Sequence, residues 1–151
     1  VKFIWIGDGE LRGELHCSNI EITGWINEIK VIEKAVNADV FLLPSLWEGL
    51  PISLLEAMSS GCVPVVSNVG GIKQLEFDDF GYKFDAFDAE KIADKIISFT
   101  ENLPEFSNQS KKAHEFVLKN YSLKNQVNKT LELYDMLLNA RGKKENKATI
   151  K

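Results

Sequence analysis

The 151-residue chain has little cysteine, no excess of basic residues and no long apolar run. Its two cysteines, Cys17 and Cys62, are too few for a disulfide framework or a cysteine-rich zinc site, which favours a reducing, cytoplasmic setting. The net charge of −4 gives no reason to expect a nucleic acid as partner. No apolar stretch approaches the roughly 20 residues that a membrane-spanning helix needs.

The pattern that is present is an alternation of short apolar strands and amphipathic helices. Strands are predicted at Lys2–Ile6, Ile20–Thr23, Val40–Leu43, Pro64–Ser67 and Gly81–Phe84. Helical segments are predicted at Glu10–Cys17, after Asn27, and at Pro51–Ser60, Gly70–Leu75, Ala89–Glu101, Phe106–Asn120 and after Ser122. Strands joined by single crossover helices imply an α/β fold: a Rossmann-like three-layer sandwich with a mostly parallel sheet and a helical C-terminal third.

One domain over residues 1–140 and a basic tail over residues 141–151 are expected. The tail is short of apolar residues and has five basic side chains against one acidic one, so it is predicted to be disordered. An ionic contact with a phosphate or a membrane surface is the alternative. Cys62, at the entry to an apolar strand, is interpreted as a small buried filler.

The stretch Val40–Met58 carries the most chemical information. Pro44 ends an apolar strand, and Gly49 with Pro51 marks a turn that leads into a helix. Backbone N–H groups of a first helical turn have no partners within the helix, so such a turn can bind an anion. Two further glycine loops, Gly7–Gly9 and Gly70–Gly71, follow other strands and are expected on the same edge of the sheet. Tight turning is the alternative explanation for each glycine.

Two carboxylates, Glu48 in this turn and Glu56 in the helix, have seven residues between them. Glu56 is expected beside the helix N-terminus, where a buried carboxylate would need donors such as the two adjacent hydroxyls of a ribose. Glu48, in the turn, can accept hydrogen bonds from sugar hydroxyls. A helix-stabilising acid for Glu56 and a solvated loop acid for Glu48 remain the alternatives.

These segments resemble a known family. The stretches Pro44–Pro51, Leu54–Met58, Gly61–Val66 and Gly70–Ile72 are similar to the E-x7-E region of retaining GT-B glycosyltransferases, in particular the family-4 (glycosyl transferases group 1) members that build polysaccharides and glycolipids. The similarity extends to Gly7–Arg12, Ile22–Trp25, Tyr121–Ser122 and Leu131–Tyr134. It therefore covers nearly the whole chain and implies one half of a GT-B fold.

The resemblance implies a role for each matching residue. Glu48, as the catalytic candidate, would hold hydroxyls of the transferred sugar, and Glu56 would bind the ribose of a UDP- or GDP-linked donor. The backbone of Gly49, Leu50 and Pro51 would face the sugar and diphosphate. The segment Gly24-Trp25-Ile26 would lie near the base. The resemblance implies no metal and no cofactor besides the nucleotide-sugar substrate.

The same resemblance implies that the chain is a carboxy-terminal fragment. No Lys or Arg occurs between Ala35 and Ile72, and the family's cations follow a strand expected before Val1. The first strand and the amino-terminal acceptor domain would be absent, and the fragment itself would be inactive. The complete enzyme would transfer a hexose with retention of anomeric configuration, in the cytoplasm or peripherally at the inner face of the membrane.

Several alternatives stay open from sequence. The chain could be a flavodoxin- or receiver-like partner-binding domain, or a sugar epimerase of GT-B fold. The strand at Lys2–Ile6 could close up against Val40–Leu43, or the fragment could pair with another copy. The base, sugar, acceptor, linkage and oligomeric state are not specified by the sequence.

Overall fold

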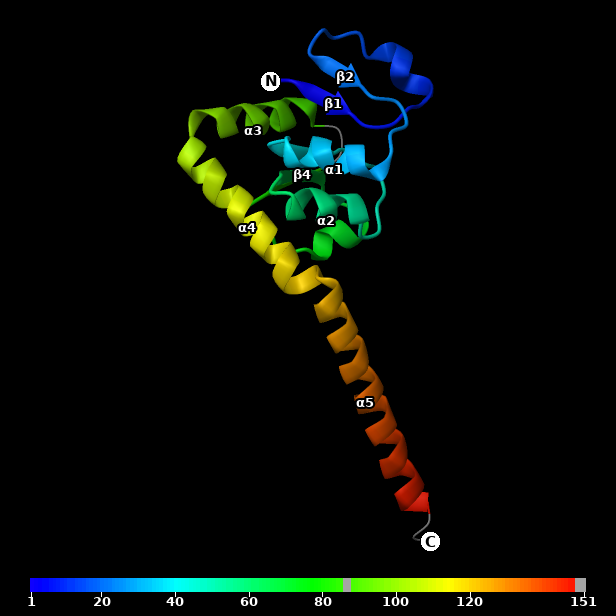
Figure 1. Ribbon diagram of the computed structural model, residues 1–151. Helices are drawn as coiled ribbons and strands as arrows, with labels where there is room; N and C mark the ends of the chain where they lie inside the picture. Colours follow the sequence, from blue (N-terminus) through cyan, green and yellow to red (C-terminus); the bar gives the residue numbers. More distant parts are fainter. Residues whose placement is uncertain (86–87, 149–151) are drawn as a thin grey trace. The chain divides into compact units, whose positions relative to one another are not determined.

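The computed structural model describes residues 1–85 and 88–148, with side chains described through residue 140 (Figure 1). The chain divides into two compact units, Val1–Glu115 and Phe116–Lys151. Every strand of the described residues lies in the first unit, and so does every candidate site residue.

The predicted strands and most predicted helices are present. The strands are β1 (Phe3–Trp5), β2 (Ile20–Ile22), β3 (Val40–Leu43), β4 (Val63–Ser67) and β5 (Tyr82–Phe84). The helices are α1 (Glu28–Val36), α2 (Ile52–Ser59), α3 (Ala89–Glu101), α4 (Leu103–Tyr121) and α5 (Leu123–Ala148), with short 3-10 helices η1 (Glu10–Glu14) and η2 (Gly70–Gln74). The predicted caps are confirmed, because the side chain of Asn27 accepts the Lys30 N–H (3.0 Å) and that of Asp88 accepts the Lys91 N–H (3.2 Å).

Three segments differ from the prediction. The helix expected over Glu10–Cys17 is the shorter η1, which has Gly13 inside it, a poor helix former. Helix α4 starts at Leu103, and Pro104 lies in its first turn, where the missing N–H removes no helical bond. Helix α5 continues over residues 141–148, where a disordered tail is predicted; Lys, Glu and Ala favour helix there. Residues 149–151 of that predicted tail lie outside the described residues.

All strand pairs are parallel, as predicted, but they form two sheets. Strand β1 pairs with β2, and β3, β4 and β5 form the second sheet in that order. Among the described residues no hydrogen-bonded pairing joins β1 to β3, so the sheet does not close up at that point.

The core lies on both faces of the second sheet. One face packs Val63, Val65 and Phe84 against Phe99 of α3. Val66, which alternates onto the other face of β4, is also fully buried, and α2 contacts β3 and β4. Two covered faces give the predicted three layers, and the loops at the carboxyl ends of the strands stay accessible.

Cys62 is buried at the start of β4, which confirms its interpretation as a filler. Its Sγ lies 3.3 Å from the carbonyl oxygen of Ala35 and 3.4 Å from that of Ala38. Burial, and to a lesser extent the charge of Asp39, raises the pKa of the Cys62 thiol to about 11. The thiol therefore stays protonated at neutral pH and is a poor nucleophile.

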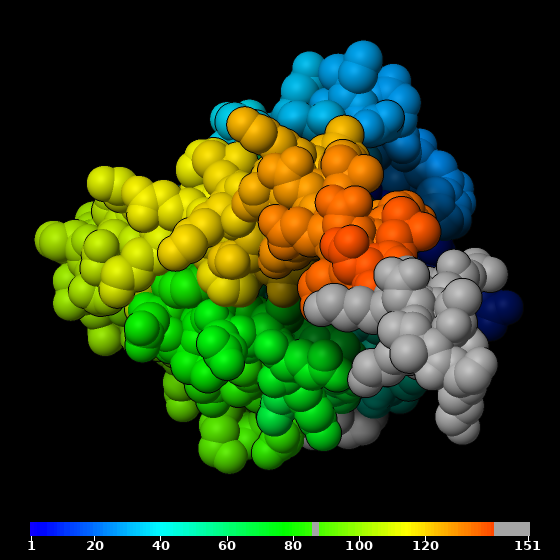
Figure 2. Space-filling view, turned by 90° about the horizontal axis from the view of Figure 1, so that it is seen from below, coloured from blue at the N-terminus to red at the C-terminus, as the bar shows by residue number. Residues whose placement is uncertain are grey.

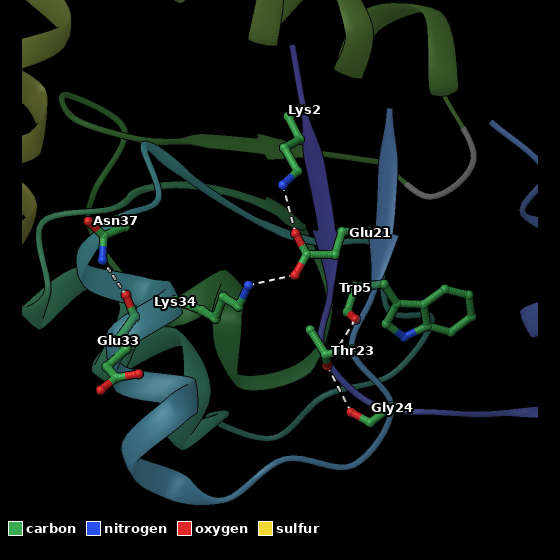
Figure 3. A network of polar contacts seen from close by, with 8 residues as sticks. All are labelled: Lys2, Trp5, Glu21, Thr23, Gly24, Glu33, Lys34 and Asn37. Atoms are coloured by element: carbon green, nitrogen blue, oxygen red, sulfur yellow. Dashed lines mark hydrogen bonds and ion pairs between the residues drawn. The ribbon is translucent and has the colours of Figure 1, made fainter. Parts of the chain in front are cut away.

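An ion-pair network joins α1 to the first sheet (Figure 3). Glu21 of β2 binds the Nζ of Lys2 at 2.7 Å and the Nζ of Lys34 in α1 at 2.6 Å. The hydrogen bond from Lys2 and then that from Lys34 lower the pKa of Glu21 from 4.5 to about 2. Because neither pair is fully buried, salt is expected to weaken the network.

Replacing Glu21 by glutamine should make the stability of the domain less dependent on acid pH. The folded-state pKa lies below the unfolded value, so the stabilisation by Glu21 is complete above pH 4.5 and is lost as the pH falls toward about 2. Urea unfolding of wild type and Glu21→Gln should therefore differ at pH 7 and converge near pH 2. The matched control is Glu33→Gln on α1, whose carboxylate forms no ion pair with the described residues. A difference that persists unchanged to pH 2 would contradict this assignment.

Candidate functional site

The loop between β3 and α2 leaves the first turn of α2 without a cap. Pro51 is the N-cap residue and makes no side-chain hydrogen bond to the turn. The N–H groups of Gly49 and Leu50 donate to no acceptor in the described part of the chain. Both residues precede the N-cap Pro51, so their N–H groups lie just before the helix N-terminus, where the helix dipole favours an anion. The predicted turn with free N–H groups is therefore present, and anion binding by it stays a prediction.

The loop after β4 supports this turn by direct backbone contact. The Gly71 N–H donates to the Glu48 carbonyl oxygen at 3.2 Å. A Cβ at Gly70 would lie 1.7 Å from the Glu48 carbonyl oxygen, and one at Gly71 would lie 2.5 Å from that of Gly49. Gly70 also has φ +47°, which favours glycine. The Glu48 turn and the Gly70–Gly71 loop therefore share one edge, as predicted, and Gly70 and Gly71 are required for their contact. The third predicted loop, Gly7–Gly9, follows β1 of the other sheet.

The two carboxylates differ from expectation in one respect. Glu48 is half-buried, whereas Glu56 is exposed on α2. The interpretation of Glu56 as a buried carboxylate is wrong, because the core-facing positions of α2 are Leu54, Ala57 and Met58. Neither carboxylate pairs with a described residue, so both can accept hydrogen bonds from a ligand.

The segment predicted near the base lies at the carboxyl ends of β1 and β2. The Gly7 N–H donates to the Gly24 carbonyl oxygen at 3.1 Å, and the Thr23 hydroxyl donates to the same oxygen at 2.8 Å (Figure 3). These bonds hold the turn that carries Trp25, which is 86% exposed, and the half-buried Ile26. The exposed indole provides a flat apolar surface on which a planar ligand can stack.

The sequence gives no role in the site to Arg12, a cation beside the turn at Gly24. Arg12 forms an ion pair with Asp8 at 2.7 Å, and its Nη1 lies 3.9 Å from an ideal Cβ at Gly24. The i,i+4 spacing of Asp8 and Arg12 is the signal that could have predicted the pair. Because Asp8 neutralises it, Arg12 contributes little net charge to the loop.

The edge also carries large exposed apolar side chains. Trp47 is 82% exposed, and Leu46, Leu50 and Ile52 of the same segment are exposed as well. The green segment in Figure 2, which includes η2 and the loop that follows, reaches the surface. Lys73, Gln74 and Asp78 of this segment are exposed. A group of exposed apolar side chains beside a turn with free N–H groups is typical of a surface that binds a ligand or another domain.

The described residues contain neither a cluster of metal-ligating side chains nor a membrane-spanning helix. No group of three or more His, Cys, Asp or Glu side chains in that part of the chain is placed to hold a metal ion. No helix there combines the length and apolar character needed to cross a membrane.

Comparison with known proteins gives consistent matches. Residues 8–117 match the family described as Glycosyl transferases group 1. An Escherichia coli protein named UDP-Gal:alpha-D-GlcNAc-diphosphoundecaprenol alpha-1,3-galactosyltransferase is 32% identical over 148 residues, covering 91% of this chain and 38% of that protein. The glycogen synthase of Fusobacterium nucleatum is 34% identical over 100 residues, covering 55% of this chain and 22% of the relative.

Solved structures match in fold. Anabaena Alr3699/HepE in complex with UDP-glucose has a TM-score of 0.75 at 20% identity, covering 87% of this chain and 41% of that one. The C-terminal domain of the glycosyl transferase group 1 family protein LpcC from Francisella tularensis has a TM-score of 0.65 at 20% identity, covering 75% and 59%. At this identity the likeness establishes the fold alone.

The chain spans 38% and 22% of the lengths of these two curated relatives. The family match covers most of the chain, including the Glu48 turn, α2 and the Gly70–Gly71 loop. The chain belongs to the glycosyl transferases group 1 family.

Proposed function

We propose that this chain is the donor-binding half of a retaining glycosyltransferase that takes a hexose from a UDP-linked donor. The observation that carries the proposal is the contact between the Glu48 turn and the Gly70–Gly71 loop. It presents a free carboxylate beside unpartnered backbone N–H groups at one edge of the fold. A nucleotide sugar offers the matching groups, since it has hydroxyls on the sugar and negative charge on the diphosphate. The UDP-Gal named for the E. coli relative and the UDP-glucose bound to Alr3699/HepE support the choice of UDP.

Each candidate site residue has a distinct role in this proposal. The Glu48 carboxylate accepts hydrogen bonds from hydroxyls of the transferred sugar and so orients its anomeric carbon. The N–H groups of Gly49 and Leu50 donate to the diphosphate. Glu56, one turn into α2, accepts both ribose hydroxyls, and Trp25 covers the base. Retention follows when the diphosphate leaves from the face that the acceptor then attacks.

The charge balance implies that the chain does not catalyse transfer alone. The N-terminus of α2 supplies only about 0.5 of a positive charge. No Lys or Arg lies between Ala35 and Ile72 to neutralise a leaving diphosphate. The proposal therefore assigns those cations, and acceptor binding, to the remainder of a longer protein; it assigns no resident metal or cofactor to this half. A lipid-linked acceptor, as in the E. coli relative's name, would place the complete enzyme peripherally at a membrane surface.

Calorimetric titration of the chain with millimolar UDP and UDP-galactose tests the proposal. Glu56→Gln should weaken both ligands by about tenfold, because the lost ribose contact is common to them. Glu48→Gln should weaken only UDP-galactose. Glu90→Gln, an exposed acid in the first turn of α3, is the matched control and should change neither affinity. A folded wild-type chain that binds neither ligand would refute the donor-binding assignment.

A further inference from the structure

Lys83 of β5 is a nearly buried ammonium that the proposed donor contacts do not use. Its side chain is 13% exposed. The Nζ donates to the Leu75 carbonyl oxygen at 2.9 Å, pairs with Asp78 at 3.1 Å and lies 5.1 Å from the centre of the Phe77 ring. All three partners belong to the segment that follows η2. An ammonium removed from water to this extent needs such partners, and here they all restrain one loop.

The loop that carries η2 is fastened to β5 at both ends. At its start, the Asn68 N–H donates to the Phe84 carbonyl oxygen at 2.8 Å. At its end, the Leu75 carbonyl oxygen accepts from Lys83. Consecutive residues of β5 therefore hold the two ends, and the side chain of Lys83 makes the second attachment.

Between these ends the loop is held by its own backbone hydrogen bonds and contacts the Glu48 turn. The Ile72 N–H donates to the Val69 carbonyl oxygen at 3.0 Å, and the Leu75 N–H donates to that of Ile72 at 3.1 Å. The Gly71 N–H reaches the Glu48 carbonyl oxygen at 3.2 Å. Because there is no space for even a Cβ at Gly70, a shift of η2 toward the turn must displace the backbone of Glu48.

We propose that Lys83 is a positioning residue for Glu48, acting through the Leu75 carbonyl and the Gly70–Gly71 contact. This inference rests on the proposed function, in which Glu48 holds the transferred sugar. The effect should be larger for the sugar than for the nucleotide. The Gly49 and Leu50 N–H groups, which face the diphosphate, belong to the turn that Gly71 contacts, whereas the ribose contact of Glu56 does not.

The ratio of the affinities for UDP-galactose and UDP separates positioning from general stabilisation. Lys83→Met should lower the ratio of the UDP-galactose affinity to the UDP affinity by about tenfold, the size expected for one lost charged hydrogen bond. In the Glu48→Gln background the same change should cause no further fall in this ratio. Lys95→Met is the matched control, since Lys95 lies over the Tyr82 and Phe99 rings of the same region but forms no hydrogen bond or ion pair with η2 among the described residues.

The outcomes distinguish the two proposals. If the wild-type chain does not prefer UDP-galactose over UDP, the sugar-binding role of Glu48 fails first. If the preference exists, is lost in Glu48→Gln and survives in Lys83→Met, the positioning role is overturned. The positioning role would also be overturned if Lys83→Met lowered the affinity ratio equally in the wild-type and Glu48→Gln backgrounds. If Lys83→Met does not fold, Lys83→Arg gives the same test, because the longer arginine side chain keeps the charge but should displace η2. An unchanged preference for UDP-galactose in Lys83→Arg would then refute the proposal.

Discussion

Replacing Gly70 by alanine is expected to cost about 3 kcal/mol of the free energy of unfolding and to abolish measurable binding of UDP-galactose. The backbone at Gly70 has φ +47°, a conformation that alanine adopts only with strain. The added Cβ would also lie 1.7 Å from the Glu48 carbonyl oxygen. Backbone atoms cannot rotate away as a flexible side chain can. The Glu48 turn must therefore move, and the carboxylate and the N–H groups that it presents move with it.

Urea unfolding and ligand titration measure the two effects separately. Gly9→Ala is the matched control, because Gly9 has an extended φ of 178° and nothing within 4 Å of its ideal Cβ. Its stability should stay within about 0.5 kcal/mol of wild type. A Gly70→Ala protein as stable as this control would show that the two loops do not touch in solution.

The fold was largely predictable from local pattern. Strands such as Val40–Leu43 are short continuous apolar runs, and the helix caps at Asn27 and Asp88 follow from residue type alone. Crossover connections then require parallel strands. The division into two sheets was not predictable in this way, because strand neighbours are determined by long-range packing and not by the pattern within each strand.

The residues of the site could be predicted from the sequence, but the backbone contacts that hold them in place could not. The Glu48 turn and the Gly70–Gly71 loop could be placed at one edge from the strand order, since both follow adjacent parallel strands. Their backbone contact joins residues more than 20 positions apart, and no local signal encodes it. The burial expected for Glu56 failed for a related reason. Its place on α2 was correct, but the face that α2 turns to the core is set by Leu54, Ala57 and Met58.

Lys83 illustrates what residue type alone conceals. A lysine inside a three-residue strand reads as a solvated side chain, yet here it is nearly buried. Its principal partner is a backbone carbonyl eight residues earlier, which has no sequence signature. The ring of Phe77 completes its surroundings. Charged residues with partners of this kind are found only once the loop conformation is known.

Replacing Phe77 by alanine is expected to cost about 3 to 4 kcal/mol of the free energy of unfolding. Phe77 is only 1% exposed, and its ring centre lies 6.0 Å from that of Phe80. The ring also fills the space beside Gly81, where an ideal Cβ would lie 2.7 Å from its Cδ2. Removing it leaves a cavity under the loop. It also takes away the aromatic face over which the Lys83 ammonium lies at 5.1 Å.

Because Phe77 and Lys83 are in contact, their losses should not add. The double variant Phe77→Ala/Lys83→Met should be more stable than the sum of the two single effects predicts, since the first change already removes a partner of the ammonium. Urea unfolding of the four proteins measures this coupling. Phe3→Ala, at a partly exposed position of β1, is the control and should lose about 1 kcal/mol or less. Strict additivity would indicate that the ring supports the core alone and that Lys83 is held by Leu75 and Asp78 without it.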